Sequence, residues 1–206
     1  MTIPVGWQAR FAWVLVVVLL LASAPQSQAA TGASGFIETL GTEAISLAAD
    51  IEKSESDKSK EFRGLLTRGF DLRTISRFVM GRYWRRLSDE QKQRYLGLFE
   101  DYLVVTYANR FNEYSGETFK VVDERPSGER GTLVTTKVFR PQGAEVVVGW
   151  HVVPNDSAFR IVDVVIEGIS MSVTQRSDFA SAIQASGGSI DAFLDSLERK
   201  VQGQIR

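Results

Sequence analysis

The sequence predicts an α+β fold: a twisted antiparallel meander of about four strands, packed with helices that precede and follow it. Residues 35–113 carry apolar side chains at helical spacing, and residues 172–202 resume this spacing with a break at Gly187-Gly188. Between these segments, residues 118–167 are rich in Val, Thr, Ile and aromatic residues, and Pro- and Gly-bearing turns divide them. Helices grouped before and after consecutive strands are typical of the α+β class.

The helical half contains two clear helix starts. Asp71 is a candidate N-cap. Ser88 and Gln91 form a capping box with acidic residues in the first turn. Polar residues 53–60 are expected to form a link. We therefore expect four helices before the sheet: residues 35–53, a short segment ending near Gly69, one from Asp71, and a long one from Ser88 to about Asn112.

The strands are apolar on both faces, which is unusual for a sheet with one side in water. In one strand Val148 and Trp150 share a face, yet Val147 takes the opposite one. Helices could cover both sides of such a sheet, or the sheet could curl around a cavity on one side. Short turns favour a meander over crossover connections. The strands are expected at residues 118–124, 132–140, 144–153 and 159–167.

The N-terminus predicts export. Arg10 precedes an apolar run from Phe11 to Ala22, and Ser27-Gln28-Ala29 supplies small residues for cleavage. The run is short for a membrane span, so a cleaved signal peptide over residues 1–29 is favoured over an uncleaved anchor. Residues 30–206 then form a single domain. The periplasm is the expected location, and no Cys follows the run to form a lipobox.

Composition excludes several kinds of site. The chain contains no Cys, so it holds neither a thiolate zinc site nor a cysteine nucleophile. Its net charge of −1 gives no support for a nucleic-acid partner, and none is expected. Charge is unevenly distributed, however, because the segment from Lys60 to Arg94 carries ten basic and four acidic residues.

A set of motifs occurs in a fixed order along the chain. The motifs are Phe70-Asp71-Leu72, Gly81-Arg82-Tyr83-Trp84-Arg85-Arg86, the run from Ser88 to Tyr107, the run from Ile161 to Ser170, and Gln175-Arg176-Ser177-Asp178-Phe179. Each alone is weak, but their order and spacing resemble the MlaC family of periplasmic phospholipid-binding proteins, also known as toluene-tolerance or ABC transporter auxiliary components. A sister group associated with hopanoid metabolism remains an alternative.

The resemblance implies a function as well as an NTF2-like fold enclosing a lipid pocket. Members of the family shuttle phospholipid between an inner-membrane ABC transporter complex, with its MCE-domain subunit, and an outer-membrane lipoprotein–porin complex. This traffic maintains the lipid asymmetry of the outer membrane. The lipid would be cargo, and no cofactor is expected.

A lipid carrier needs a deep apolar pocket. Two acyl chains of roughly 16 carbons, at about 0.8 kcal/mol per CH₂, cost on the order of 20 kcal/mol or more to expose to water. For any single candidate, an ordinary core position is the alternative. The candidate lining residues are Phe78, Val79, Leu98, Phe99, Tyr102, Leu103 and Phe111 from helices, and Val148, Trp150, Val164, Ile166, Ile169 and Met171 from the sheet and its exit.

The basic segment suggests a second site. Arg82, Arg85 and Arg86 could bind an anionic head group or steer the protein to acidic partners. The alternative is a solvated helix face on which these side chains pair with nearby Asp and Glu.

No catalytic or metal site is expected. His151 is the only histidine and suits a structural role on its strand. Asp163 and Glu167 share a strand face about 13 Å apart, too far for a glycosidase pair. Walker, H-E-x-x-H, G-x-S-x-G and Rossmann motifs do not occur. Two alternatives to the carrier remain: an NTF2-like enzyme with Asp163 as its base, and an interaction module with a solid core.

Overall fold

The computed structural model describes residues 32–108, 114–129, 131–155 and 158–204. The predicted signal peptide and Phe111 lie outside these ranges. Within the described part of the chain, no helix is both long and apolar enough to cross a bilayer. The helices are α2 (Ala33–Ala49), α3 (Glu55–Gly69), α4 (Leu72–Met80), the 3₁₀ helix η1 (Gly81–Arg86), α5 (Asp89–Ala108), α6 (Met171–Ala185) and α7 (Ile190–Gln204).

The sheet confirms the predicted antiparallel meander. Its strands follow chain order, so each pairs with its sequence neighbours. The fifth strand has two residues and extends the predicted set of four. The strands are β1 (Thr118–Ser127), β2 (Gly131–Phe139), β3 (Val146–Asn155), β4 (Ala158–Ile166) and β5 (Ile169–Ser170).

The first two helices differ from their predicted limits. Helix α2 ends at Ala49, and Ile51 is 88% exposed, so it does not continue the apolar face. The predicted link over residues 53–60 is wrong, because α3 begins at Glu55. Ser54 caps this helix by accepting a hydrogen bond from the backbone N–H of Asp57 (3.1 Å). The first turn of α3 is almost wholly polar, which hides it from a search for apolar periodicity.

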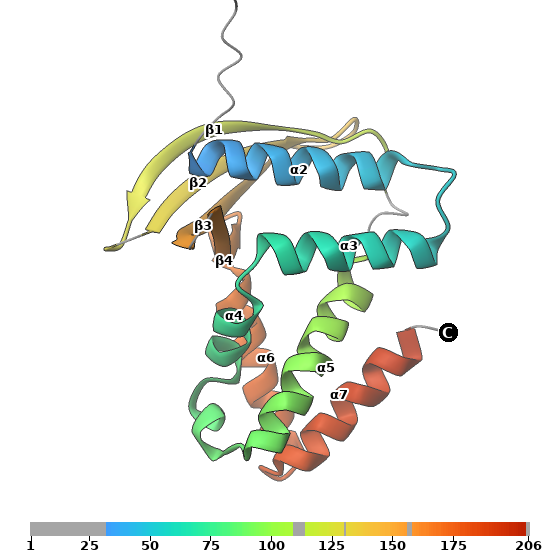
Figure 1. The fold of residues 1–206 in the computed structure, drawn as a ribbon, viewed down its shortest axis with the longest axis vertical. Coiled ribbons are helices and arrows are strands. Elements are labelled where there is room, and N and C mark those ends of the chain that lie inside the picture. The colour runs from blue at the N-terminus through green and yellow to red at the C-terminus, as the bar shows by residue number, and fades with distance from the viewer. Residues whose placement is uncertain (1–31, 109–113, 130, 156–157, 205–206) are drawn as a thin grey trace, which may run out of the picture.

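The elements form two halves of the molecule (Figure 1). In the upper half the curved sheet arches over α2, and α3 runs alongside α2 on the side away from the sheet. In the lower half α4 packs against α6, and α5 packs against α7. The fold is therefore α+β, as predicted.

The buried apolar residues form three clusters. The largest lies in the lower half, where Tyr95, Phe99 and Phe179 pack edge to face or at a tilt with ring centroids 5.8–6.3 Å apart. A second joins α2 to the sheet through Ile37, Val134 and other side chains. A third, smaller cluster joins α3 to α5.

Phe70, between α3 and α4, connects all three clusters. Its ring packs against each of them. Its backbone forms a parallel bridge with Ile161 of β4, and the next N–H, that of Asp71, donates to the carbonyl of Ile161 (2.9 Å). Asp71 in turn caps α4, accepting from the N–H of Thr74 (2.9 Å). The segment thus fixes the helical half to the sheet.

Truncation of Phe70 tests this connection. We expect Phe70→Ala to lower the free energy of unfolding by about 3 kcal/mol, because it removes apolar contacts from three clusters at once. Phe139→Ala is the matched control, since Phe139 is 40% exposed, and it should cost less than about 1 kcal/mol. Urea unfolding followed by circular dichroism measures both. Equal losses in the two variants would contradict the role assigned to Phe70.

Candidate functional site

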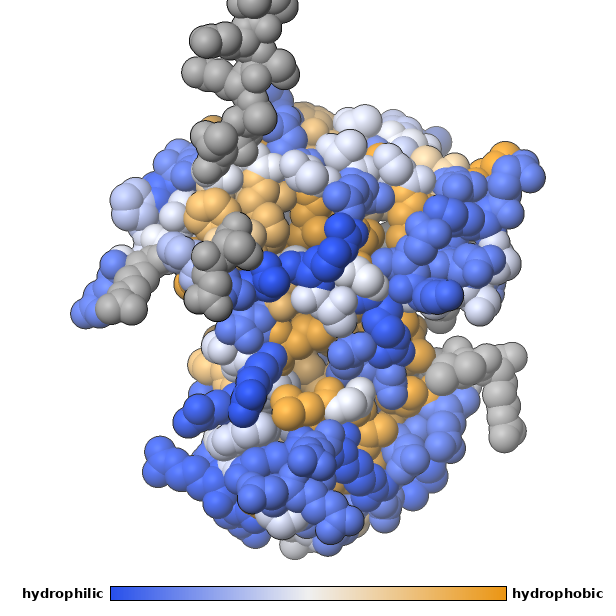
Figure 2. All heavy atoms as spheres, viewed as in Figure 1, coloured by the Kyte–Doolittle hydropathy of each residue, from blue (hydrophilic) through white to orange (hydrophobic). Residues whose placement is uncertain are grey.

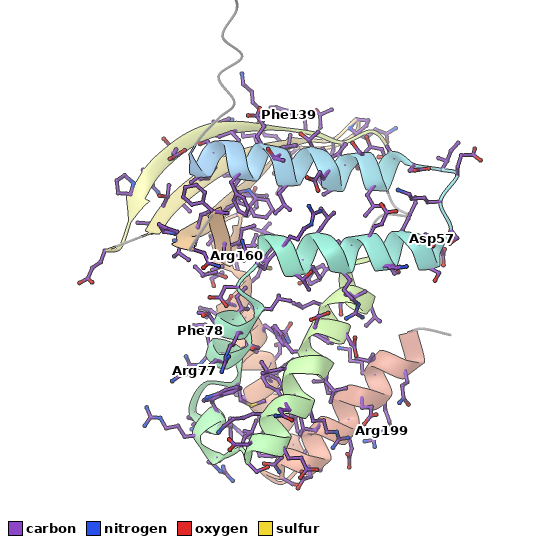
Figure 3. The ribbon with its side chains drawn as sticks, in the orientation of Figure 1. Asp57, Arg77, Phe78, Phe139, Arg160 and Arg199 are labelled. Carbon is purple, nitrogen blue, oxygen red and sulfur yellow. The ribbon has the colours of Figure 1, made fainter. Side chains whose placement is uncertain are left out.

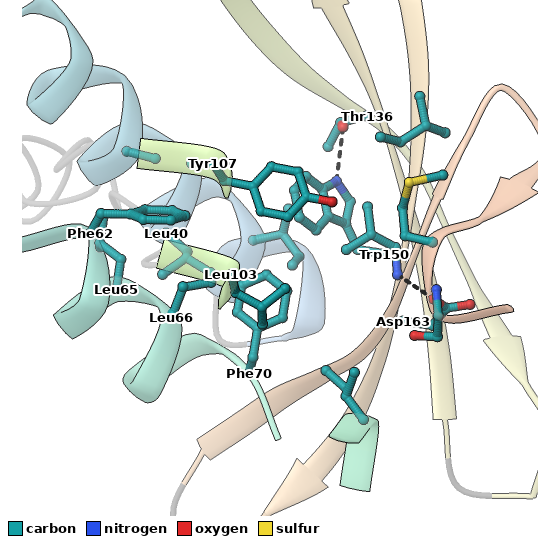
Figure 4. A pocket seen from close by; sticks show the side chains of 18 of the residues that line it. Leu40, Phe62, Leu65, Leu66, Phe70, Leu103, Tyr107, Thr136, Trp150 and Asp163 are labelled. Carbon is teal, nitrogen blue, oxygen red and sulfur yellow. Dashed lines mark hydrogen bonds between the residues drawn. The ribbon is translucent and has the colours of Figure 1, made fainter. Parts of the chain in front are cut away.

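A cavity of about 460 Å³ lies between the sheet and the helices. Helices α2 and α3 form one wall, strands β1–β4 form another, and α4, α5 and α6 close the end (Figure 4). Most of its lining side chains are apolar. The cavity exists because the three core clusters surround this space and do not fill it.

Small residues set how close α2 comes to its neighbours. A Cβ at Gly41 would lie 2.5 Å from the ring of Phe119, and one at Gly69 would lie 2.6 Å from Leu40. These glycines let α2 approach β1 and the end of α3. Gly41, Leu40 and Phe119 also line the cavity, so the same contacts shape its wall.

Two of the residues that line the cavity are also partly exposed to solvent. Tyr107 near the end of α5 is 41% exposed, and Ile166 at the end of β4 is 37% exposed, although both line the space. Deeper residues are nearly inaccessible, with Val79 at 2% and Phe99 at 1%. Apolar surface is also visible in crevices between the two halves of the molecule (Figure 2).

The polar groups in the wall have structural partners. The indole N–H of Trp150 donates to Thr136 Oγ1 (3.0 Å), whose hydroxyl donates to the carbonyl of Val148 (3.3 Å). The carboxylate of Glu117 accepts from the backbone N–H (2.8 Å) and hydroxyl (3.0 Å) of Ser115. The hydrogen bond from this N–H is the main cause that holds the pKa of Glu117 below its ordinary value.

Asp163 anchors α6 to the sheet. Its Oδ1 accepts from the backbone N–H groups of Val164 (2.9 Å) and Ser172 (3.0 Å), and its Oδ2 accepts from Ser170 Oγ (2.6 Å). Ser170 is also the N-cap of α6, since its Oγ accepts from the N–H of Val173 (3.1 Å). Both oxygens of the Asp163 carboxylate therefore accept hydrogen bonds from nearby residues of the chain. His151 stands apart from the cavity lining, with its Nδ1 3.2 Å from Ser127 Oγ.

Seven of the predicted pocket residues line the cavity. They come from α4, α5, β3, β4 and the start of α6, which lie far apart in the sequence and meet at this space. They are Val79, Phe99, Leu103, Trp150, Val164, Ile166 and Met171.

Three predicted pocket residues are core residues instead. Leu98 packs against the lower cluster, and Val148 is buried in β3 between its strand partners. Tyr102 also belongs to the lower cluster, where its ring lies 5.7 Å from that of Phe179. Its hydroxyl donates to Gln175 Oε1 (3.2 Å).

Two others lie on the surface. Phe78 is 42% exposed, with the guanidinium carbon of Arg176 5.0 Å from its ring centroid. It faces out because α4 turns Ile75 and Val79 inward, and residue 78 falls outside that stripe. Ile169 is 59% exposed, because it follows the tight turn at Glu167-Gly168 that ends β4. Neither residue lines the cavity.

The sequence interpretation missed the wall made by α2 and α3. Its apolar residues had a detectable signal, since they recur at helical spacing, but that spacing does not distinguish a core face from a cavity face. The missed residues are Ile37, Leu40, Ala44, Ile45, Phe62, Leu65, Leu66 and Phe70.

The arginines of η1 lie away from the cavity. Arg82 donates a hydrogen bond to the hydroxyl of Tyr83 (2.9 Å), and the guanidinium carbons of Arg82 and Arg86 lie 5.0 and 5.5 Å from its ring centroid. The hydrogen bond from Arg82 is the main cause that lowers the pKa of Tyr83. Arg82, Arg85 and Arg86 are exposed and form no salt bridge with any carboxylate in the described ranges.

The described residues contain no cluster of three or more His, Asp or Glu side chains that could hold a metal ion. The mostly apolar lining of the cavity suits an apolar occupant.

Comparison with known proteins places this arrangement in a family. The MlaC protein family matches residues 41–199, which is most of the chain. The chain belongs to the MlaC family. The resemblance predicted from the motifs is thereby confirmed.

Two similar proteins extend the comparison. The toluene tolerance protein Ttg2D of Pseudomonas putida is 27% identical over 122 residues. That match spans 59% of this chain and 57% of the relative. A phospholipid-binding protein from Ralstonia solanacearum, solved in complex with a phospholipid, has the same fold with a TM-score of 0.73. It is 18% identical, and the match covers 84% of this chain and 99% of that one.

Proposed function

We propose that this MlaC protein is a periplasmic lipid carrier that holds a phospholipid by its acyl chains. The observation that carries the proposal is the apolar cavity between the sheet and the helices. Its volume of about 460 Å³ falls in the range of ligand-binding pockets. The phospholipid bound to the R. solanacearum relative supports the same cargo.

The energetics favour an occupied cavity. An occupant would remove the apolar wall from water and supply the dispersion contacts that an unfilled space lacks. Apolar cavities resist filling by water, because a water molecule needs polar partners. Polar groups of this wall, such as Trp150, Glu117 and Asp163, already have hydrogen-bond partners within the protein. Acyl chains meet the requirement, and the head group would stay at the solvent-exposed side near Tyr107 and Ile166.

The remaining steps of the proposed role rest on the predicted signal peptide and on what membership of the MlaC family implies. The predicted signal peptide would deliver the protein to the periplasm. There it would shuttle phospholipid between the inner-membrane ABC transporter complex, with its MCE-domain subunit, and the outer-membrane lipoprotein–porin complex. Such transport would maintain outer-membrane lipid asymmetry. Tail-only binding requires no cofactor and tolerates several head groups.

The exposed arginines of η1 would steer docking. Arg82, Arg85 and Arg86 lie outside the cavity and form no salt bridge with a carboxylate in the described ranges. Their positive charges can therefore attract acidic surfaces of the two complexes. This role is favoured over recognition of the head group.

Native mass spectrometry of protein purified from bacteria tests the cargo. We expect bound phospholipid on the wild type and its loss from Ala44→Trp, because the indole would occupy the cavity. Ala49→Trp is the control: Ala49 is exposed at the end of the same helix, and this variant should keep its lipid. Circular dichroism checks that both variants fold.

Two results would contradict the proposed cargo. Wild-type protein without any lipid would remove the carrier function, and folded Ala44→Trp with a full complement of lipid would move the binding site elsewhere. If the mass of the bound molecule matched a triterpenoid, the cargo would be of the hopanoid type and not a phospholipid.

Charge reversal tests docking. The double variant Arg85→Glu, Arg86→Glu should slow transfer of labelled phospholipid to membranes carrying either complex by about tenfold at low salt, and by less at high salt. The control pair Arg125→Glu, Arg199→Glu changes the net charge equally at other exposed positions and should have little effect. An unchanged rate for the η1 variant at low salt would rule out steering by these arginines.

A further inference from the structure

Exposed aliphatic side chains gather where the sheet passes into α6. Ile166 and Ile169 are direct partners in the β4–β5 ladder, with exposures of 37% and 59%. Val173, in the first turn of α6, is 56% exposed. The nearby carboxylate of Glu167 is engaged, because it accepts from the N–H of Val147 (2.6 Å).

This apolar surface is continuous with the cavity. Ile166 lines the cavity while remaining more than one-third exposed, and Met171, between Ile169 and Val173 in sequence, also lines it. An occupant leaving the cavity beside Ile166 would therefore meet aliphatic side chains before it met open water.

Arginines flank the surface. Arg176 lies one turn after Val173 on the same face of α6, and its guanidinium covers the exposed ring of Phe78 on α4 (5.0 Å). Arg77 is the neighbour of Phe78, and both lie on the flank of the molecule opposite Arg199 (Figure 3). Within the described ranges Arg77 and Arg176 form no salt bridge, whereas Arg63 and Arg94 each pair with two acids.

We propose that this apolar–basic rim seats the protein directly on an anionic phospholipid bilayer. The rim consists of Ile166, Ile169, Val173 and Phe78 with Arg77 and Arg176. The inference rests on the proposed function, since it concerns the route of the same lipid.

An anionic bilayer surface attracts exposed apolar side chains that lie beside basic side chains without a salt-bridge partner. The aliphatic and aromatic groups enter the boundary between head groups and acyl chains, and the guanidinium groups bind lipid phosphates. Two features of the rim fit a bilayer surface: its positive charge and its position beside the cavity. The rim pairs cations with lipid phosphates, and it adjoins the opening through which an acyl chain would pass. Seating there shortens the path over which the chain contacts water.

Vesicle flotation tests the rim. Full-length mature protein is mixed with vesicles of equal parts phosphatidylglycerol and phosphatidylcholine, or of phosphatidylcholine alone. We expect flotation with the anionic vesicles, weakened about tenfold by Ile169→Asp because an aliphatic group that would enter the bilayer is replaced by a charge. Arg77→Glu should weaken it by a similar factor.

Matched controls separate the rim from general effects. Ile51→Asp places the same change at an isoleucine that is 88% exposed after α2, and Arg199→Glu repeats the charge reversal on α7. Both should float like the wild type. Absence of flotation, equal flotation with neutral vesicles, or equal losses in rim and control variants would each overturn the proposal.

Native mass spectrometry of the same samples distinguishes failure of the proposed rim from failure of the proposed carrier function. Ile169 lies outside the cavity lining, so Ile169→Asp should retain its lipid. Retained lipid with no vesicle binding by the wild type would overturn the rim alone. Absence of lipid from the wild type would instead overturn the carrier function.

Discussion

The pairing of Phe70 with Ile161 is the constraint on which the rest of the structure depends. It holds the segment between α3 and α4 against β4, so the helical half and the sheet meet along one line. Apolar clusters form on both sides of that line, and the space between them stays open as the cavity. The same residue therefore stabilises the fold and forms part of the cavity wall.

The fold was accessible from the sequence because its signals are local. The change from helical to strand spacing near residue 118 and the capping box at Ser88 each depend on neighbouring residues, and both match the structure. The start of α3 was missed because a polar first turn carries capping information without apolar periodicity. The two-residue strand β5 is too short to show any period.

The site was only partly accessible because a cavity is a non-local property. Trp150 and Val164 were identified from strands that are apolar on both faces, and they do line the space. Spacing alone could not separate Tyr102, which packs on Phe179, from Leu103 beside it, which faces the cavity. Whether an inward side chain meets another side chain or an open space depends on how helices α2 and α3 lie over the sheet.

In the proposed carrier, acyl chains occupy the space between the sheet and α2–α3. Photo-crosslinking with a phospholipid that carries a diazirine at the end of one acyl chain tests it most directly. We expect labelled peptides from inside the cavity, at Leu65 and Leu66 of α3, Leu103 of α5 and Trp150 of β3. Labelling confined to exposed positions such as Phe139 and Ile51 would contradict it.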